Sequence, residues 1–203
     1  DNSRVNFRNV PSEKALGAYD QPFNNTTSVV WELPYGRGRK WGSTLPAIAD
    51  GVLGGWRLTG INTMTSGQPI NITYSPTAAG QVSGAPSYRP IYLGGDLYAS
   101  TKTAGAWFNR AAFALPGINE PFGNLGRNVG RTEAIYNFDL GLHKNFRLWS
   151  EASRLEFRSE FFNLFNTTNL GSPAQNVSNA NFGVITGLSS PARQIQFALK
   201  LVF

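Results

Sequence analysis

The chain has 203 residues, a formal net charge of +6 and no cysteine. The absence of cysteine excludes a disulfide scaffold and a thiolate metal site. The basic residues are scattered and form no basic helix, so the charge does not indicate nucleic-acid binding. Only 15% of the residues are charged, whereas glycine and aromatic residues are abundant, which favours strands joined by loops.

The first predicted strand lies near residues 26–34. The preceding residues 1–25 are polar and contain two prolines, so we expect no more than one helical turn there. In the strand, Val29, Trp31 and Leu33 share one face, because successive side chains of a strand point to opposite sides. A proline and a glycine-rich turn end it.

The second strand is predicted near 55–65, beginning at Trp56. The link before it, residues 35–55, is rich in glycine, and one or two helical turns are expected around 46–53. Beyond a Ser-Gly break, Gln68–Thr73 is a candidate continuation of the second strand, which would leave residues 74–131 as the irregular part of the loop that follows.

A long loop is predicted over residues 68–131, rich in glycine, proline, serine and alanine. Within it, residues 107–113 are expected to form a short packed turn or helix. A structureless loop of this length is uncommon in a compact soluble domain. It is ordinary on the outer side of a large membrane barrel.

Strand alternation returns near 133–146 and again near 153–165, with a short link around 147–152 between the two. A second polar loop, 166–191, follows and contains a brief strand-like segment at 182–186. In the strand near 153–165, Glu156, Arg158 and Glu160 alternate with apolar residues. This alternation predicts a ladder of ion pairs on a water-lined face.

The closing strand, near 192–203, carries a continuous apolar face formed by Ile195, Phe197, Leu199, Leu201 and Phe203. A soluble edge strand seldom leaves such a stripe at an unprotected terminus. About 9–11 tilted residues suffice to cross an outer membrane. The strand is therefore predicted to cross a membrane, and the cell outer membrane is the expected location.

The connection lengths predict the topology of the chain. Membrane barrels have short periplasmic turns and long outer loops. The link 147–152 is then periplasmic and the loops 68–131 and 166–191 are extracellular, while the periplasmic link 35–55 is longer than expected. The predicted fold class is all-β: an antiparallel, up-and-down transmembrane β-barrel sector of about five to seven strands, open in isolation, with long extracellular loops.

A closed membrane barrel needs at least eight strands. Residues 1–203 are therefore expected to be the C-terminal sector of a larger barrel. The sequence contains no signal peptide and starts at Asp1, which also favours a fragment of an exported protein.

Seven groups of residues occur in order between about Glu13 and the end of the chain. They are Trp31-Glu-Leu-Pro-Tyr-Gly-Arg-Gly-Arg-Lys40, Gly54-Gly-Trp-Arg-Leu-Thr-Gly60 with Ser66-Gly-Gln-Pro69, Trp107-Phe-Asn-Arg-Ala-Ala-Phe113, Phe122-Gly-Asn-Leu-Gly-Arg-Asn128, Asn137-Phe-Asp-Leu140 with Lys144-Asn-Phe146, Phe157-Arg-Ser-Glu-Phe-Phe-Asn-Leu-Phe-Asn166, and Arg193-Gln-Ile-Gln-Phe-Ala-Leu-Lys-Leu-Val-Phe203. Together they resemble the C-terminal part of TonB-dependent outer-membrane receptors. The most similar type is the Oar-like one, which has a carboxypeptidase-regulatory-like N-terminal domain.

This resemblance implies a 22-stranded barrel closed by an N-terminal plug, which takes up a bulky nutrient. It implies as partners outer-membrane lipid, the remainder of the barrel and plug, and the TonB complex acting through N-terminal parts. Phe197, Leu199, Leu201 and Phe203 resemble the signal that the barrel-assembly machinery recognises. The resemblance assigns no ligand-binding residues, because the outer loops of this family diverge.

No catalytic, cofactor or metal site is predicted, and no enzymatic activity is expected. His143 is the only histidine, and in an extended strand Asp139 lies too far from it for a tight catalytic pair. Two other hypotheses remain open. One is an outer-membrane barrel for adhesion or secretion without transport, and the other is a soluble all-β carbohydrate-binding module.

Overall fold

The computed structural model describes residues 9–149 and 153–203. The chain divides into two compact units, and each is described by itself. The sheet unit comprises Asn24–Met64, Tyr136–Thr168 and Pro191–Phe203. The loop unit comprises Asp1–Phe23, Thr65–Ile135 and Asn169–Ser190.

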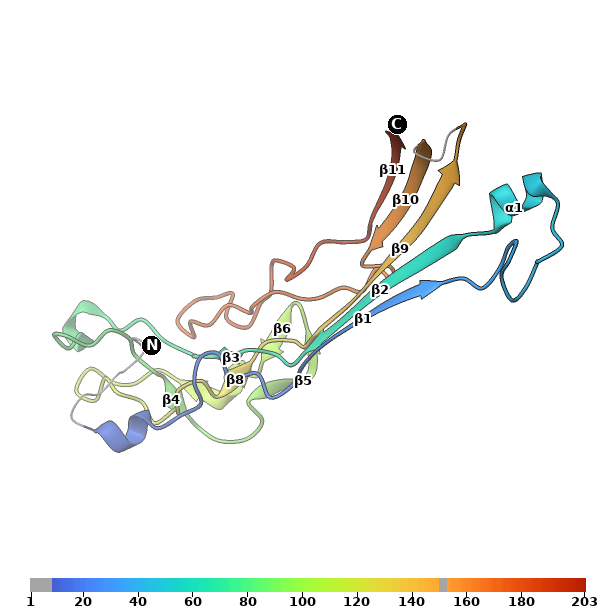
Figure 1. The fold of residues 1–203 in the computed structure, drawn as a ribbon. Helices are drawn as coiled ribbons and strands as arrows, with labels where there is room; N and C mark the ends of the chain where they lie inside the picture. Colours follow the sequence, from blue (N-terminus) through green and yellow to red (C-terminus); the bar gives the residue numbers. More distant parts are fainter. Residues whose placement is uncertain (1–8, 150–152) are drawn as a thin grey trace. The chain divides into compact units, whose positions relative to one another are not determined.

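A five-stranded sheet forms the sheet unit, in the order β1-β2-β9-β10-β11 (Figure 1). Consecutive long strands are thus neighbours, and β10 pairs antiparallel with both β9 and β11. The strands are β1 (Asn24–Glu32), β2 (Trp56–Thr65), β9 (Ile135–Arg147), β10 (Arg154–Phe162) and β11 (Gln194–Val202). A short helix, α1 (Ala47–Leu53), lies in the link between β1 and β2, where helical turns were expected.

The register of the strands gives the sheet one apolar and one polar face. Residues opposite each other on neighbouring strands point to the same side. Leu155 on β10 lies opposite Leu201 on β11 and Phe146 on β9. The next residue of β10, Glu156, lies opposite Lys200 and Asn145 on the other side. The predicted alternation of the strands is therefore continuous across β9, β10 and β11.

The sheet is open, with β1 and β11 at its edges. Every residue of β1 is exposed, and so are all residues of β11 except the last. The predicted fold class is confirmed: the long strands form an antiparallel up-and-down sheet that does not close by itself. The described part of the chain has no helix long and apolar enough to cross a membrane.

Short elements make up the loop unit. Three two-stranded pairs occur among its described residues: β3 (Pro69–Ile70) with β8 (Gly130–Arg131), β4 (Ile91–Tyr92) with β7 (Phe113–Ala114), and β5 (Tyr98–Thr103) with β6 (Ala106–Phe108). The 3-10 helices are η1 (Val10–Glu13), η2 (Ala78–Gly80) and η3 (Arg110–Ala112). Residues 107–113 form the expected packed turn, at the junction of β6, η3 and β7.

The loop unit has its own hydrophobic core, which the sequence analysis did not predict. Phe182 is central, since its ring stacks on Phe108 at 5.5 Å and meets Phe113 edge-on at 5.3 Å. The core consists of Ile70, Ile72, Trp107, Phe108, Ala112, Phe113, Leu125, Val177, Phe182 and Ile185. The two predicted loops, 68–131 and 166–191, are therefore not structureless, because residues from both pack into this one core.

Two smaller predictions for these loops are wrong. The segment Gln68–Thr73 does not extend β2, because its residues Pro69–Ile70 form β3 and pair with β8. The segment 182–186 is not a strand but a turn that continues as irregular chain. There the amide of Ile185 donates to the carbonyl of Ala104 at 2.7 Å, in place of a ladder partner.

Phe182→Ala should destabilise the loop unit by about 3–5 kcal/mol, because truncating a buried Phe leaves a cavity. Hydrogen exchange resolved by peptide, measured on the whole chain, should show faster exchange in loop-unit peptides. Leu188→Ala is the matched control, since this side chain is exposed. Equal protection in the two variants would contradict a packed core around Phe182.

Candidate functional site

The polar face of the sheet is the first candidate site. It collects the side chains that alternate with the apolar ones on the three strands β9, β10 and β11 and on β2. Its members include Arg57, Thr59, Asp139, His143, Asn145, Arg154, Glu156, Arg158, Glu160, Gln196 and Lys200. In a membrane barrel the face opposite the lipid lines the interior.

Glu156 is the centre of an ion-pair ladder on this face. Its carboxylate lies 2.9 Å from the Nε of Arg154 and 3.6 Å from the Nη2 of Arg158. The amide of Gln196, on the neighbouring strand, donates to the carboxylate of Glu160. The predicted ladder is therefore present around Glu156, whereas Glu160 has a hydrogen bond to Gln196 and no ion pair among the described residues.

His143 contacts Thr59 across the face, with 3.1 Å between Nε2 and Oγ1. A side chain at Gly141 would meet both of these groups, so glycine makes room for the contact. Asp139 does not pair with His143. Its carboxylate accepts hydrogen bonds from the Asn137 side chain at 2.9 Å and from the Asn163 amide at 2.8 Å.

The predicted assembly signal lies at the edge of the sheet. Phe197, Leu199 and Leu201 project from β11 onto the apolar face, and Phe203 follows that strand. The four side chains are between 50% and 91% exposed. Their recognition by the barrel-assembly machinery stays a prediction.

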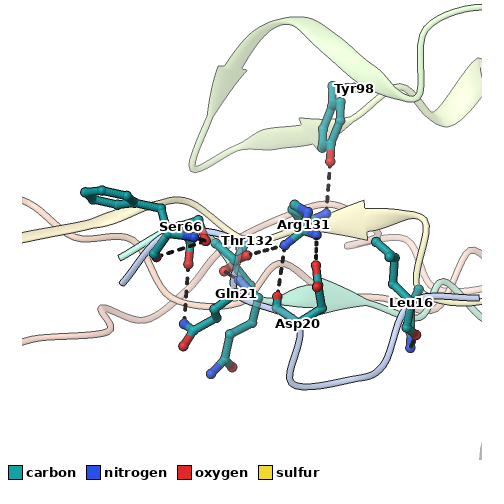
Figure 2. Close-up of polar contacts among 11 residues, drawn as sticks. Leu16, Asp20, Gln21, Ser66, Tyr98, Arg131 and Thr132 are labelled. Atoms are coloured by element: carbon teal, nitrogen blue, oxygen red, sulfur yellow. Dashed lines mark hydrogen bonds and ion pairs between the residues drawn. The ribbon is translucent and has the colours of Figure 1, made fainter. Parts of the chain in front are cut away.

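Arg131, in β8, joins three segments of the loop unit (Figure 2). Its guanidinium donates to the carbonyls of Asp20 at 3.0 Å and Gly67 at 2.9 Å, and it forms an ion pair with the Asp20 carboxylate. Its backbone amide donates to the hydroxyl of Tyr98 at 2.9 Å. The segments before β1 and after β2 are thereby held to β8 and β5.

A buried ion pair forms a second polar contact inside the loop unit. Arg89 and Glu13 form two parallel hydrogen bonds, at 2.8 and 3.1 Å, with side chains only 4% and 8% exposed. This two-pronged geometry is the strong form of a charge-assisted bond. The pair connects η1 to a segment 76 residues further along the chain.

Tyr74 is a third buried polar group of the loop unit. Its hydroxyl donates to the carbonyl of Pro121 at 2.5 Å, and its ring meets Tyr88 edge-on. Burial, and to a smaller extent Tyr88, raise the pKa of Tyr74 above the usual 10.0. The neutral phenol is therefore the form that the folded loop unit favours.

Sequence reasoning found the ladder on β10 but missed Arg131, Arg89 and Glu13. These residues belong to irregular segments in which no periodicity indicates a partner. One signal was available: no charged residue occurs between Arg57 and Arg89. A lone charge after so long an uncharged stretch is a candidate for a buried pair. No group of three potential metal-ligating side chains occurs in the described part of the chain.

Arg89→Met should cost about 3–5 kcal/mol of stability, because Glu13 would stay buried without the guanidinium that makes two hydrogen bonds to it. The double variant Arg89→Met with Glu13→Gln should recover part of this loss. Urea unfolding of the whole chain provides the measurement. Arg39→Met, which breaks the exposed pair with Glu32, should change stability little. A double variant no more stable than Arg89→Met alone would contradict the assignment.

The raised pKa of Tyr74 predicts a pH dependence. The neutral Tyr74 side chain contributes fully to stability below the pKa that tyrosine has in the unfolded chain, about 10. This contribution is lost as the pH rises through the higher pKa of Tyr74 in the folded protein. Tyr74→Phe should therefore make thermal stability fall less steeply above that pH. Tyr19→Phe, at an exposed site, should behave as the unchanged protein does. An equal loss of thermal stability in the two variants as the pH rises would contradict this prediction.

Comparison with known protein families assigns the chain to a family. A family model described as an outer membrane beta barrel domain matches residues 1–196. Phe197, Leu199, Leu201 and Phe203 lie beyond the matched residues. Comparisons with characterised proteins and with solved structures find no significant match.

The match covers nearly the whole chain and agrees with an open antiparallel sheet that has one apolar face. This family is located in the outer membrane, and so is the chain. The hypothesis of a soluble carbohydrate-binding module therefore does not hold. The chain belongs to the outer membrane beta barrel domain family.

Proposed function

We propose that the chain is part of a TonB-dependent outer-membrane receptor that takes up a bulky nutrient and catalyses no reaction. The resemblance of seven ordered groups of residues to such receptors supports this. So does the division of the chain into a membrane sheet and a separately packed loop unit.

The core of the loop unit is the observation that carries the proposal. Loops that only surround a pore can be irregular, whereas the loops of this chain pack around a buried aromatic cluster centred on Phe182. Ordered loops bind a ligand more tightly, because less conformational entropy is lost on binding. The Arg131 contacts and the buried pair of Arg89 with Glu13 add to that order.

The sheet supports a barrel wall with the polar face inward. Its edge strands, β1 and β11, expose backbone groups that would cost several kcal/mol each in lipid if left unpaired. Under the proposal, further strands of the same receptor pair with these edges and a plug fills the interior. The TonB complex then supplies the energy, and the assembly machinery recognises Phe197, Leu199, Leu201 and Phe203.

Uptake by cells tests the proposal. Cells with and without the gene receive three labelled probes: a ferric siderophore, cobalamin and a maltooligosaccharide. The receptor should raise the accumulation of at least one probe, and a protonophore should abolish that gain. The loop variant Phe182→Ala should weaken accumulation, whereas Leu188→Ala should not.

Three outcomes would overturn the proposal. One is accumulation that persists with the protonophore, which indicates a passive pore. Another is accumulation of no probe by cells whose outer membrane contains the protein. The third is attachment of cells to a surface, lost with the gene, without any uptake, which indicates adhesion.

A further inference from the structure

One end of the sheet combines a basic cavity with exposed apolar side chains. Only the six residues 148–153 separate β9 from β10, whereas 163–193 separate β10 from β11. Because short turns of membrane barrels are periplasmic, this end faces the periplasm. The α1 link lies at the same end, since Lys144 near the end of β9 contacts it.

A cavity of about 750 Å³ opens at this end, between the α1 link and the ends of β9 and β10. Its charged lining is strongly basic. Among the described residues it consists of Arg37, Arg39, Lys144, Arg147 and Arg154 with the carboxylate of Asp50, and Arg39 and Arg154 also pair with Glu32 and Glu156. The cavity is large enough for a phosphate-bearing head group, and its charge favours an anion.

Two of these arginines form no ion pair with any described residue. Within the described part of the chain Asp50 forms no ion pair with the Arg37 side chain, and its carboxylate accepts instead from the backbone amide of that residue at 2.6 Å. The guanidinium of Arg37 uses only its Nε, toward the carbonyl of Leu45 at 2.8 Å, within the described part of the chain. Arg147 is exposed, and the described residues offer its side chain no hydrogen bond or ion pair. It is the last residue of β9 and lies opposite Arg154, in the register of the polar face, and at this rim of the sheet both arginines line the same cavity as Lys144 of the apolar face.

Lys144 places the α1 link on the lipid side of the sheet. It is the one cation among the described residues of β9 that shares the apolar face, opposite Phe157, and it is only 4% exposed. Its ammonium donates to the carbonyls of Val52, at 3.0 Å, and Gly54. The rings of Trp56 and Phe146 flank it at 5.2 and 5.1 Å.

The α1 link presents apolar side chains outward. Ile48 is 86% exposed and Val52 is 59% exposed, although both belong to a helix. Trp41, before the helix, is also exposed and has the ammonium of Lys40 5.3 Å from its ring. Tryptophan beside lysine at the end of membrane strands is typical of the boundary between lipid and water.

An apolar hollow of about 540 Å³ lies on the sheet between β1, β2 and β9. Trp31 and Phe138 line it, and Gly60 deepens it because it has no side chain. Leu140 of the hollow and Lys144 of the basic cavity are both on the apolar face of β9. They are four positions apart along the strand, which is about 13 Å.

We propose that this end of the sheet binds one anionic phospholipid of the periplasmic leaflet. The phosphate occupies the basic cavity near Arg37 and Arg147, and an acyl chain lies along the apolar hollow. Basic pockets beside membrane segments recognise anionic lipid head groups in this way. The proposal rests on the outer-membrane location and is independent of the transported nutrient.

Native mass spectrometry of the full chain, extracted from outer membranes in neutral detergent, tests the proposal. The chain is titrated with phosphatidylglycerol, phosphatidylethanolamine and soluble glycerol phosphate. Phosphatidylglycerol should bind most tightly. Arg37→Gln with Arg147→Gln should weaken that binding about 25-fold, or about fivefold for each charge removed. Arg147→Gln alone provides the test should the double variant not fold.

Lys14→Gln with Lys102→Gln is the matched control, because it removes two exposed charges from the loop unit. This control should keep the affinity for phosphatidylglycerol. Equal affinity for phosphatidylglycerol and phosphatidylethanolamine would overturn the proposal, as would an equal loss in the control. Glycerol phosphate binding as tightly as the lipid would show a site for soluble anions and would overturn it as well.

Discussion

The register of β10 against its two neighbours is the constraint on which the sheet depends. It brings Leu155, Leu201 and Phe146 together on one side, and Glu156, Lys200 and Asn145 on the other. A slip of one residue would exchange the faces and place the charged ladder in lipid. Lipid on one side and water on the other therefore select this register, as a packed core does in a soluble sheet.

The sheet could be predicted from sequence because its information is local. Most of the long strands show their two faces through alternation within about ten residues, although it weakens after Leu58 in β2, and an up-and-down topology places consecutive strands side by side. The ladder around Glu156 follows from the same alternation. The helical turns of α1 were also predictable, since a short apolar segment lies between glycine-rich stretches.

The loop unit could not be predicted in this way because its contacts are non-local. Phe108, Phe113 and Phe182 contact one another, although the segments that contain them show no regular alternation of apolar and polar residues. Arg89 and Glu13 are 76 residues apart, and nothing near either residue indicates the other. Their composition predicted loops, and these segments indeed contain only short strands and short 3-10 helices. It missed their packing, which depends on side chains brought together by the chain as a whole.

The link between β1 and β2, predicted from the sequence to be periplasmic, is longer than a tight turn for a reason that the structure shows. Gly36 has a φ of +125°, and a side chain there would lie 2.7 Å from the Asp50 carboxylate. That carboxylate accepts the Arg37 amide, so the turn before α1 is held against the helix. Lys144 then fixes the carbonyls at the end of α1. The extra length is therefore a folded element anchored to the apolar side of the sheet, and a two-residue turn could not provide it.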